Sequence, residues 1–452
     1  MSVDVQPTGT AGTGMTGPEA SELVAGLSAW LAAPDKATTL ARAKRYWNPG
    51  KTAFWEEAGT PLVIGARDGY LLRDLDGATL IDVHLNGGTY NLGHRNPELL
   101  ATLAAASTRV DIGNHHFAAP GRAALAEALS RTGPIPDALV ALGSGGGEAI
   151  DLAIKSARYA TGRDVIVSVI GAYHGHTGLA VATGDARYAA PFRAAQPGAF
   201  VQVPYNDLAA MEARLAAGDV AAVIMETIPA TFGFPLPAPG YLAGVAAACA
   251  RTGALYIADE VQTGLGRTGE LWGITKHGVT PDILVSGKGL AGGLYPISAV
   301  ILGPAAAGWL SEDGFAHIST FGGAELGCAV ALKTLEITLR PQTRERVARL
   351  TDRFRAGLSA IAADDPDWLV EVRQDGLVIG LRFAHPEGAR FVSRRLYAAG
   401  VWAIFAALDP RVLQFKPGLL VSDALADDIL ERTAGAVAAA RADALAAPAP
   451  TG

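Results

Sequence analysis

Four polar positions directly follow apolar runs of the sequence, and their side chains could do acid–base or cofactor chemistry. They are Tyr173 with His174, Glu226, Asp259 with Glu260, and Lys288. In open α/β sheets, ligands gather beyond the carboxyl ends of the strands. These positions are therefore the first candidates for a functional site.

Lys288 and Asp259 each allow a functional and an ordinary interpretation. Lys288 ends an apolar run and is followed by glycines, which let another group approach the backbone closely. The alternative is a solvated surface lysine. Asp259 ends the run Leu255–Ala258, so its carboxylate must find a positive or donor partner. A protonated pyridine nitrogen would serve, and so would capping of the next turn.

A glycine-rich stretch, Gly143–Glu148, precedes an amphipathic helical pattern. Free N–H groups at such a helix start form an anion site that suits phosphate. The dinucleotide fingerprint Gly-x-Gly-x-x-Gly fails here because Glu148 stands at its last position. A second match, Gly264–Gly269, continues without a convincing helix, so the sequence gives no support for NAD binding.

Short apolar runs alternate with helical patterns between Ala138 and Gly303. The runs that predict buried strands are Asp164–Gly171, Val220–Glu226, Ala254–Val261, Asp282–Ser286 and Ile297–Gly303. This alternation predicts an α/β fold in which helices cover both faces of a largely parallel sheet. From about Leu335 the pattern changes to a long helix, strands around Asp375-Gly376, and then helix, strand and helix. That change predicts a second, smaller α+β domain.

The expected domain boundaries follow these changes of pattern. Residues 1–18 hold few large apolar groups and should form a disordered tail. The remaining parts are an N-terminal segment over 19–75, a large domain over 76–334, a small C-terminal domain over 335–446 and a frayed tail over 447–452.

The bulk properties narrow the class of protein. The chain has 452 residues, half of them apolar, which is enough for a full core. Its net charge of −7 offers no basic surface, so we expect no nucleic-acid partner. Two cysteines, no signal peptide and no apolar stretch long enough for a membrane predict a soluble, cytoplasmic protein. The adjacent His115 and His116 cannot both face one ion, so we expect no metal site.

Three motifs together make the sequence resemble the class III aminotransferases, which are enzymes that use pyridoxal 5′-phosphate (PLP). They are Ala258–Gly269, Ser286–Gly293 and Ser319–Gly323, and the resemblance covers roughly residues 60 to 430. It implies the aspartate-aminotransferase-like fold (fold type I), with a mostly parallel, seven-stranded type of sheet and a smaller α+β C-terminal domain. It also implies that the large domain binds PLP.

The resemblance assigns roles around the cofactor. It implies that Lys288 holds PLP as a Schiff base and that Asp259 pairs with the pyridinium nitrogen. Gln262 would lie near the ring hydroxyl, and Gly146 and Gly147 would offer backbone N–H groups to the phosphate. Once a substrate amine displaced it, the Lys288 amine would carry the proton between the substrate carbon and the cofactor.

Three more residues complete the implied site. Tyr173 would stack on the ring face, and Glu226 falls where the family has a strand-end acid near the substrate. Thr320 would reach the phosphate of the neighbouring subunit, so the active unit would be a homodimer. The other partners would be small amine and carbonyl substrates.

The sequence departs from the family pattern where the substrate would bind. Many members carry an arginine near the C-terminus that can clamp a carboxylate, and Gln414 stands there instead. Lys416, two residues on and on the same strand face, could supply the charge. The stretch Glu226–Phe234 also differs, and Ala324 stands where asparagine is common. The chain looks most like enzymes of aminoglycoside antibiotic pathways that act at a sugar C6′ position, so we expect an amino-sugar aminotransferase.

Two other functions stay open. A PLP-dependent isomerase, either an aminomutase or an epimerase, would also remove a proton through Lys288 but would return it to the same substrate. Turnover without an amino donor would favour it. A non-catalytic PLP-binding protein is disfavoured because such proteins usually lose the lysine or the aspartate, and Lys288 and Asp259 are both present.

Overall fold

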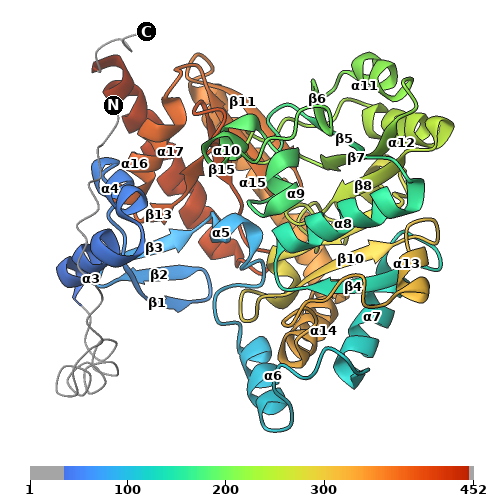
Figure 1. The fold of residues 1–452 in the computed structure, drawn as a ribbon. Coiled ribbons are helices and arrows are strands. Elements are labelled where there is room, and N and C mark those ends of the chain that lie inside the picture. Colours follow the sequence, from blue (N-terminus) through green and yellow to red (C-terminus); the bar gives the residue numbers. More distant parts are fainter. Residues whose placement is uncertain (1–34, 447–452) are drawn as a thin grey trace, which may run out of the picture. The chain divides into compact units, whose positions relative to one another are not determined.

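The computed structural model describes residues 35–446, which divide into two compact units (Figure 1). Of the described residues, 35–66 with 73–78 form one unit, and 67–72 with 79–446 form the other. The expected tails over 1–18 and 447–452 lie outside the described residues. None of the helices within 35–446 is both long enough and apolar enough to cross a membrane.

The first unit contains three short helical segments. They are α3 (Lys36–Arg42), the π-helical turn η1 (Ala43–Trp47) and α4 (Pro49–Glu57). The side chain of Asp35 caps α3 by accepting from the Thr38 N–H, and that of Asn48 caps α4 by accepting from the Lys51 N–H. The chain passes between the two units within strands β1 (Ile64–Asp68) and β2 (Leu71–Asp74).

A seven-stranded sheet forms the centre of the second unit. Its strands are β4 (Leu139–Gly143), β5 (Val165–Val169), β6 (Phe200–Val203), β7 (Val220–Glu226), β8 (Leu255–Asp259), β9 (Ile283–Ser286) and β10 (Ser298–Leu302). Their order is β4-β10-β9-β8-β7-β5-β6, and only β10 runs antiparallel to its neighbours. The predicted mostly parallel sheet of fold type I is therefore confirmed.

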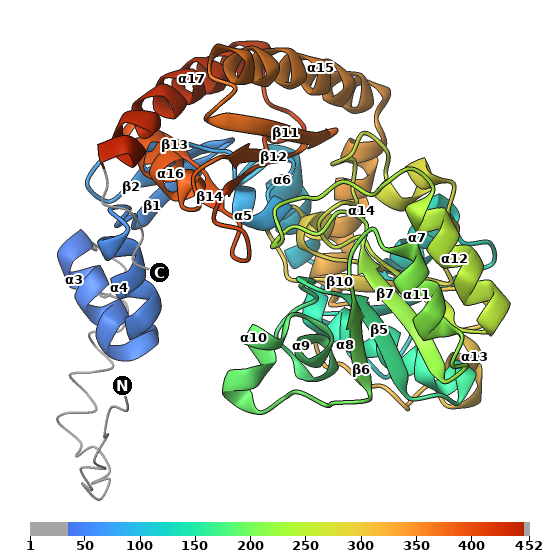
Figure 2. The same cartoon turned by 90° about the horizontal axis from the view of Figure 1, so that it is seen from above.

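Helices cover both faces of this sheet (Figures 1 and 2). On one face lie α8 (Gly146–Thr161), α9 (Gly178–Thr183) and α13 (Gly308–Glu312); on the other lie α7 (Pro120–Thr132), α11 (Leu208–Leu215), α12 (Tyr241–Thr252) and α14 (Glu325–Leu339). Along β8, Leu255 and Ile257 join one apolar cluster whereas Tyr256 and Ala258 join the other. A strand buried on both faces explains why its sequence is continuously apolar.

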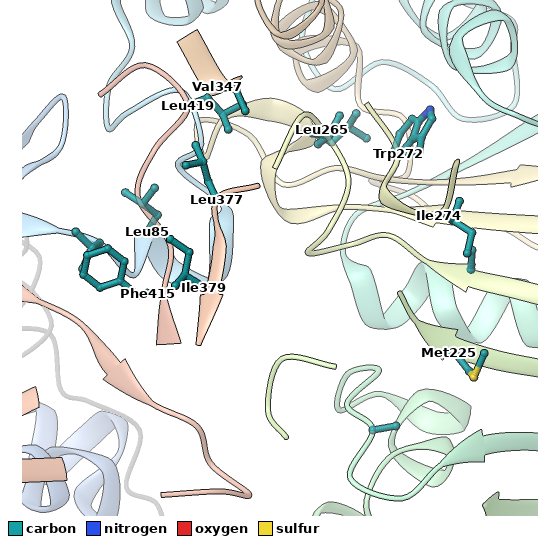
Figure 3. Packing of buried hydrophobic residues seen from close by; sticks show 14 of the residues in the cluster. Leu85, Met225, Leu265, Trp272, Ile274, Val347, Leu377, Ile379, Phe415 and Leu419 are labelled. Carbon is teal, nitrogen blue, oxygen red and sulfur yellow. The ribbon is translucent and has the colours of Figure 1, made fainter. Parts of the chain in front are cut away.

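The larger apolar cluster continues from the sheet into the C-terminal part of the chain. Figure 3 shows Met225, Trp272 and Ile274 near the sheet and Leu377 and Phe415 at the far side of the same cluster. The cluster also includes residues of α5 (Leu85–Gly88), α6 (Pro97–Ser107) and the 3₁₀ turns η3 (Gly273–His277) and η4 (Lys288–Ala291). Two further short elements, α10 (Ala186–Ala189) and the 3₁₀ turn η2 (Ala190–Phe192), follow α9. The C-terminal strands are therefore packed as part of the core that carries the sheet.

The C-terminal part has its own antiparallel sheet, with helices along it (Figure 2). The strands are β11 (Leu369–Asp375), β12 (Val378–Phe383), β14 (Ile404–Phe405) and β15 (Val412–Phe415), in the order β11-β12-β15-β14. The helices are α15 (Pro341–Asp364), α16 (Gly388–Ala398) and α17 (Asp423–Ala446). Strand β13 (Val401–Trp402) instead pairs in parallel with β3 (Thr79–Asp82). A domain boundary near residue 335 stays a prediction.

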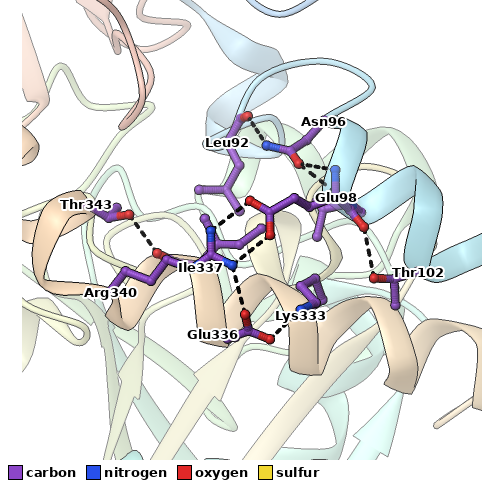
Figure 4. Close-up of polar contacts among 10 residues, drawn as sticks. Leu92, Asn96, Glu98, Thr102, Lys333, Glu336, Ile337, Arg340 and Thr343 are labelled. Atoms are coloured by element: carbon purple, nitrogen blue, oxygen red, sulfur yellow. Dashed lines mark hydrogen bonds and ion pairs between the residues drawn. The ribbon is translucent and has the colours of Figure 1, made fainter.

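Charged side chains join α6 to the end of α14 (Figure 4). Arg340 donates to both carboxylate oxygens of Glu98, at 2.7 and 2.6 Å, and to Glu336 at 2.8 Å. These groups are solvent-accessible, so the pairs contribute little to stability. These pairs help to position α14, which also packs against η4, the turn that begins at Lys288.

The packing of α15 on the C-terminal sheet gives a stability prediction. Phe354 is fully buried, and its ring centroid lies 5.8 Å from that of Phe415 at the end of β15. Phe354→Ala should lower the free energy of unfolding by about 3–5 kcal/mol, because it leaves a cavity in a close-packed core. Arg355→Ala, one residue on and exposed, should change it by less than about 0.5 kcal/mol. Urea unfolding measures both; equal effects would contradict the described packing.

Candidate active site

A cavity opens at the carboxyl ends of β7, β8 and β9. The residues that line it are Gly146, Gly147, Tyr173, His174, Gly175, Glu226, Asp259, Val261, Gln262 and Lys288. It thus brings together seven of the residues predicted from the sequence, drawn from five separate segments. The predicted Thr320, Gln414 and Lys416 are not among the lining residues.

Lys288 stands at the first position of η4, directly after β9. Its φ of +41° lies in the left-handed region, which residues with a Cβ rarely adopt and which clusters at functional sites. A Cβ on Gly87 would lie 3.0 Å from the Lys288 Cε, so the glycine leaves room for the lysine stem. Burial lowers the pKa of Lys288, although the charges of Asp259 and Glu226 oppose that shift. A lowered pKa leaves more of the amine unprotonated near neutral pH, and the unprotonated form is the one that acts as a base and nucleophile.

Asp259 ends β8 and is only 4% exposed. Its Oδ2 lies 2.8 Å from Nδ1 of His174, and its Oδ1 accepts from the Val261 N–H at 3.1 Å. Nε2 of His174 is buried without a hydrogen-bond partner in the described part of the chain. Because a carboxylate has about four acceptor directions, Asp259 can accept one more donor from the cavity. A protonated ring nitrogen is such a donor.

The start of α8 forms the wall opposite these acids. Gly146 and Gly147 are the first two residues of the helix. Their N–H groups therefore have no partner within the helix and lie at the positive end of its dipole. A Cβ on Gly147 would lie 2.8 Å from Oγ1 of Thr177, and one on Gly175 would lie 2.9 Å from the Gly147 Cα. Glu148 is turned aside, since Ser144 donates to it through N–H and Oγ. The helix start therefore suits an anion such as phosphate.

Glu226 ends β7 directly beside Asp259 in the parallel register. Its two oxygens accept from the Tyr173 N–H at 3.0 Å and the Ala230 N–H at 3.1 Å. Burial raises the pKa of Glu226 to about 7, with a smaller contribution of the same sign from Asp259. The carboxyl group is therefore close to half protonated at neutral pH.

The Tyr173 ring belongs to an aromatic group at the mouth of the cavity. It packs edge-on against His176 and Tyr188, with ring centroids 5.3 and 5.5 Å away. These contacts fix the ring as a flat, apolar wall. Burial raises the pKa of Tyr173, so its hydroxyl stays neutral at physiological pH.

Two predicted substrate residues, Gln414 on β15 and Lys416 directly after it, do not line the cavity. Lys416 is 1% exposed, and its Nζ donates to Oε1 of Gln262 at 3.0 Å and to Oε1 of Gln414 at 2.6 Å. Gln414 in turn donates to the Ala230 carbonyl at 3.0 Å. Both ends of the Gln414 amide are therefore engaged within the protein.

Thr320 lies on an exposed stretch between α13 and α14, away from the cavity. Its neighbours Phe315, Ile318 and Phe321 are 64, 53 and 56% exposed. In this single chain Thr320 contacts none of the cavity residues that the sequence predicted.

Sequence reasoning missed the roles of three residues at the site. His174 was named with Tyr173 as a strand-end candidate but was given no role, and it contacts Asp259 directly. Gly87 and Gly175 lie where another part of the chain, Lys288 and Gly147 respectively, approaches closely. Both stand in glycine-rich runs, a pattern that could have indicated this close packing.

Comparisons with known proteins agree with this geometry. The family model "Aminotransferase class-III" matches residues 55–437. An uncharacterized aminotransferase of Archaeoglobus fulgidus is 45% identical over 402 residues, covering 89% of this chain and 94% of that protein. A putrescine aminotransferase of Pectobacterium atrosepticum is 31% identical over 84% of each chain. The ornithine aminotransferase of Toxoplasma gondii, in a structure with partial PLP occupancy, has a TM-score of 0.84 and 26% identity, covering 94% of this chain and 99% of its own.

The buried Glu226 gives a pH prediction. A carboxyl group with a raised folded pKa binds a proton more tightly when folded, so its contribution to stability falls as pH rises from about 4.5 to about 7. Glu226→Gln removes this titration. The free energy of unfolding of the variant minus that of the wild type should rise across this window by on the order of 3 kcal/mol and then level off. Chemical unfolding at several pH values measures it; parallel curves would contradict the raised pKa.

Proposed function

The chain belongs to the class III aminotransferase family, and from that premise we propose that it moves an amino group between an amine donor and an aldehyde or ketone of an amino sugar. As a member of this family the enzyme depends on PLP. The proposal goes beyond family membership in two respects. The substrate is an amino sugar, and the enzyme acts in the cytoplasm in aminoglycoside antibiotic biosynthesis.

The cavity fits PLP on the chemistry of its donor set. It combines a lysine amine of lowered pKa, a buried carboxylate with free acceptor capacity and an anion-binding helix start. When bound, PLP supplies an aldehyde for the amino group and a ring that withdraws electrons from the reacting carbon. Lys288 would hold the aldehyde carbon, Asp259 the ring nitrogen, and Gly146 with Gly147 the phosphate.

The protein's own groups would move and hold the protons. Lys288, once displaced by a substrate amine, would take a proton from the substrate carbon and pass it to the cofactor, which its lowered pKa assists. Asp259 would pair with the ring nitrogen, and the His174 contact at 2.8 Å holds the carboxylate in place. Tyr173 contributes the flat wall against which a ring can stack.

The single observation that carries the substrate proposal is the charge of the cavity lining. In the described part of the chain the lining contains two acids, Glu226 and Asp259, one amine, Lys288, and no arginine. The Gln414 amide cannot replace a guanidinium fork, because both of its ends are engaged. A substrate held by its carboxylate is therefore disfavoured, and a cationic, hydroxyl-rich amine is favoured. The related putrescine aminotransferase supports this, because its named substrate is a diamine without a carboxylate.

A donor panel tests this substrate class. The PLP-loaded enzyme is mixed separately with aminoglycosides that carry a 6′-amino group, with putrescine, with ornithine and with β-alanine. We expect the aminoglycosides to convert the cofactor to its amine form, measured by visible absorbance, at least tenfold more efficiently than ornithine or β-alanine. Conversion by the two amino acids but by no aminoglycoside would reject the amino-sugar proposal and leave the aminotransferase assignment intact.

We propose further that the active unit is a homodimer in which Thr320 reaches the partner's phosphate site. Two features support this: Thr320 lies away from its own cavity, and the residues around it expose apolar side chains that a second copy would cover. The same apolar residues would form part of the interface.

Subunit mixing tests the position of Thr320. Lys288→Ala removes the anchor, and Thr320→Glu places a negative charge where phosphate would bind. If Thr320 acts across the interface, co-expression of the two inactive variants should restore about a quarter of wild-type activity, because each mixed dimer keeps one intact site. No recovery in mixed dimers, verified by two affinity tags, would place Thr320 in its own subunit's site or outside the site altogether.

A further inference from the structure

Lys416 has an unusual environment for a lysine. It lies at the end of β15, almost fully buried, and within the described residues its ammonium contacts no carboxylate. Instead it donates to two amide oxygens, those of Gln262 and Gln414, and lies 5.4 Å from the ring centroid of Phe234. A buried lysine without a counter-ion is costly, so its retention calls for a role.

The backbone around Lys416 is fixed on both sides. Its own N–H donates to the Val83 carbonyl at 2.6 Å, and the Pro417 carbonyl accepts from Arg267 at 2.5 Å. The Lys416 side chain therefore extends to Gln262 from a backbone that hydrogen bonds hold in place. Its hydrogen bond joins positions 154 residues apart in the chain, from the C-terminal sheet to the loop after β8.

The contact with Lys416 decides which end of the Gln262 amide faces the cavity. The Lys416 amine donates to both amide oxygens, so the Gln262 oxygen is turned toward it. The NH₂ group of Gln262 is then left on the other side of the amide. Since Gln262 lines the cavity and Lys416 does not, that group is a donor available to a bound molecule.

The same lysine also orients the residues that hold Glu226. With its oxygen held by Lys416, Gln414 turns its NH₂ group to the Ala230 carbonyl. The Ala230 N–H in turn donates to Glu226, which lines the cavity. One buried amine therefore sets the polarity of a hydrogen-bonded chain that reaches both Gln262 and Glu226.

We propose that Lys416 is a positioning residue: it acts through Gln262, whose amide it turns to present an N–H donor to an acceptor oxygen on the bound cofactor. This inference rests on PLP binding at the cavity and not on which substrate the enzyme uses. It also differs from a role in binding a substrate carboxylate, because the lysine is separated from the cavity by the amide that it orients.

A double-mutant cycle on the PLP-loaded enzyme tests the proposal without any substrate. Lys416→Met removes the donors at similar volume, and Gln262→Leu removes the amide. Each variant should raise the dissociation constant for PLP on the order of tenfold, as expected for one lost hydrogen bond, and weaken the visible circular dichroism of the bound cofactor. The double variant should lose no more than either single one, because both changes remove the same donor. The matched control is Lys333→Met, at a lysine paired with Glu336 near the surface, which should bind PLP as the wild type does.

Two results would overturn the proposal. The first is a loss of PLP affinity of about a hundredfold in the double variant, which would show that the two single losses are independent. The second is unchanged PLP binding in Lys416→Met. In the second case, a raised KM for ornithine alone would identify Lys416 as a carboxylate-binding residue. If Lys416→Met does not fold, Gln262→Glu serves, since it keeps an oxygen toward Lys416 but lacks the NH₂ group. It should bind PLP about tenfold more weakly, and wild-type affinity would reject the proposal.

Discussion

Two buried carboxyl groups stand side by side at the ends of neighbouring parallel strands, and the rest of the site depends on how the protein tolerates them. The register of β7 and β8 places Glu226 beside Asp259. Two adjacent negative charges away from water are costly unless donors or protons compensate them. Asp259 has His174 and a backbone N–H, and Glu226 has two backbone N–H groups. The remaining cost appears as the pKa of Glu226, raised to about 7.

Two further basic residues, Arg267 and Lys416, are buried outside the cavity. Arg267 is fully buried and donates to the carbonyls of Leu377 and Pro417 and to the side chain of Asn91. Burial lowers its pKa to about 10 and, together with the charges of Arg267 and Lys288, lowers that of Lys416. Within residues 35–446 neither Arg267 nor Lys416 forms an ion pair. Neither residue lines the cavity, so Lys288 is the cation among the described lining residues.

Much of this arrangement could be predicted from the sequence because the sheet is buried on both faces. Continuous apolar runs indicated β5, β7, β8, β9 and β10, and the rule that ligands gather at strand ends singled out Glu226, Asp259 and Lys288. The short edge strand β6 was not predicted, because four residues at the edge of a sheet carry too weak a pattern.

The features that escaped prediction depend on contacts between distant segments. Alternation along a strand placed Gln414 and Lys416 on one face, but it could not show that Gln262 would lie between Lys416 and the cavity. The Lys288 side chain likewise passes close to Gly87, which is far away in sequence, where a Cβ would lie 3.0 Å from its Cε. The proposed place of Thr320 depends on a second chain, which no pattern within one sequence can position.

The most direct test of this account is to locate the covalent bond to the cofactor. Borohydride reduction of the PLP-loaded enzyme converts the lysine–cofactor linkage to a stable secondary amine, and peptide mass spectrometry then identifies the modified lysine. The account predicts that the added mass is found on Lys288 alone. Modification of Lys416 or another lysine, with Lys288 unmodified, would contradict it.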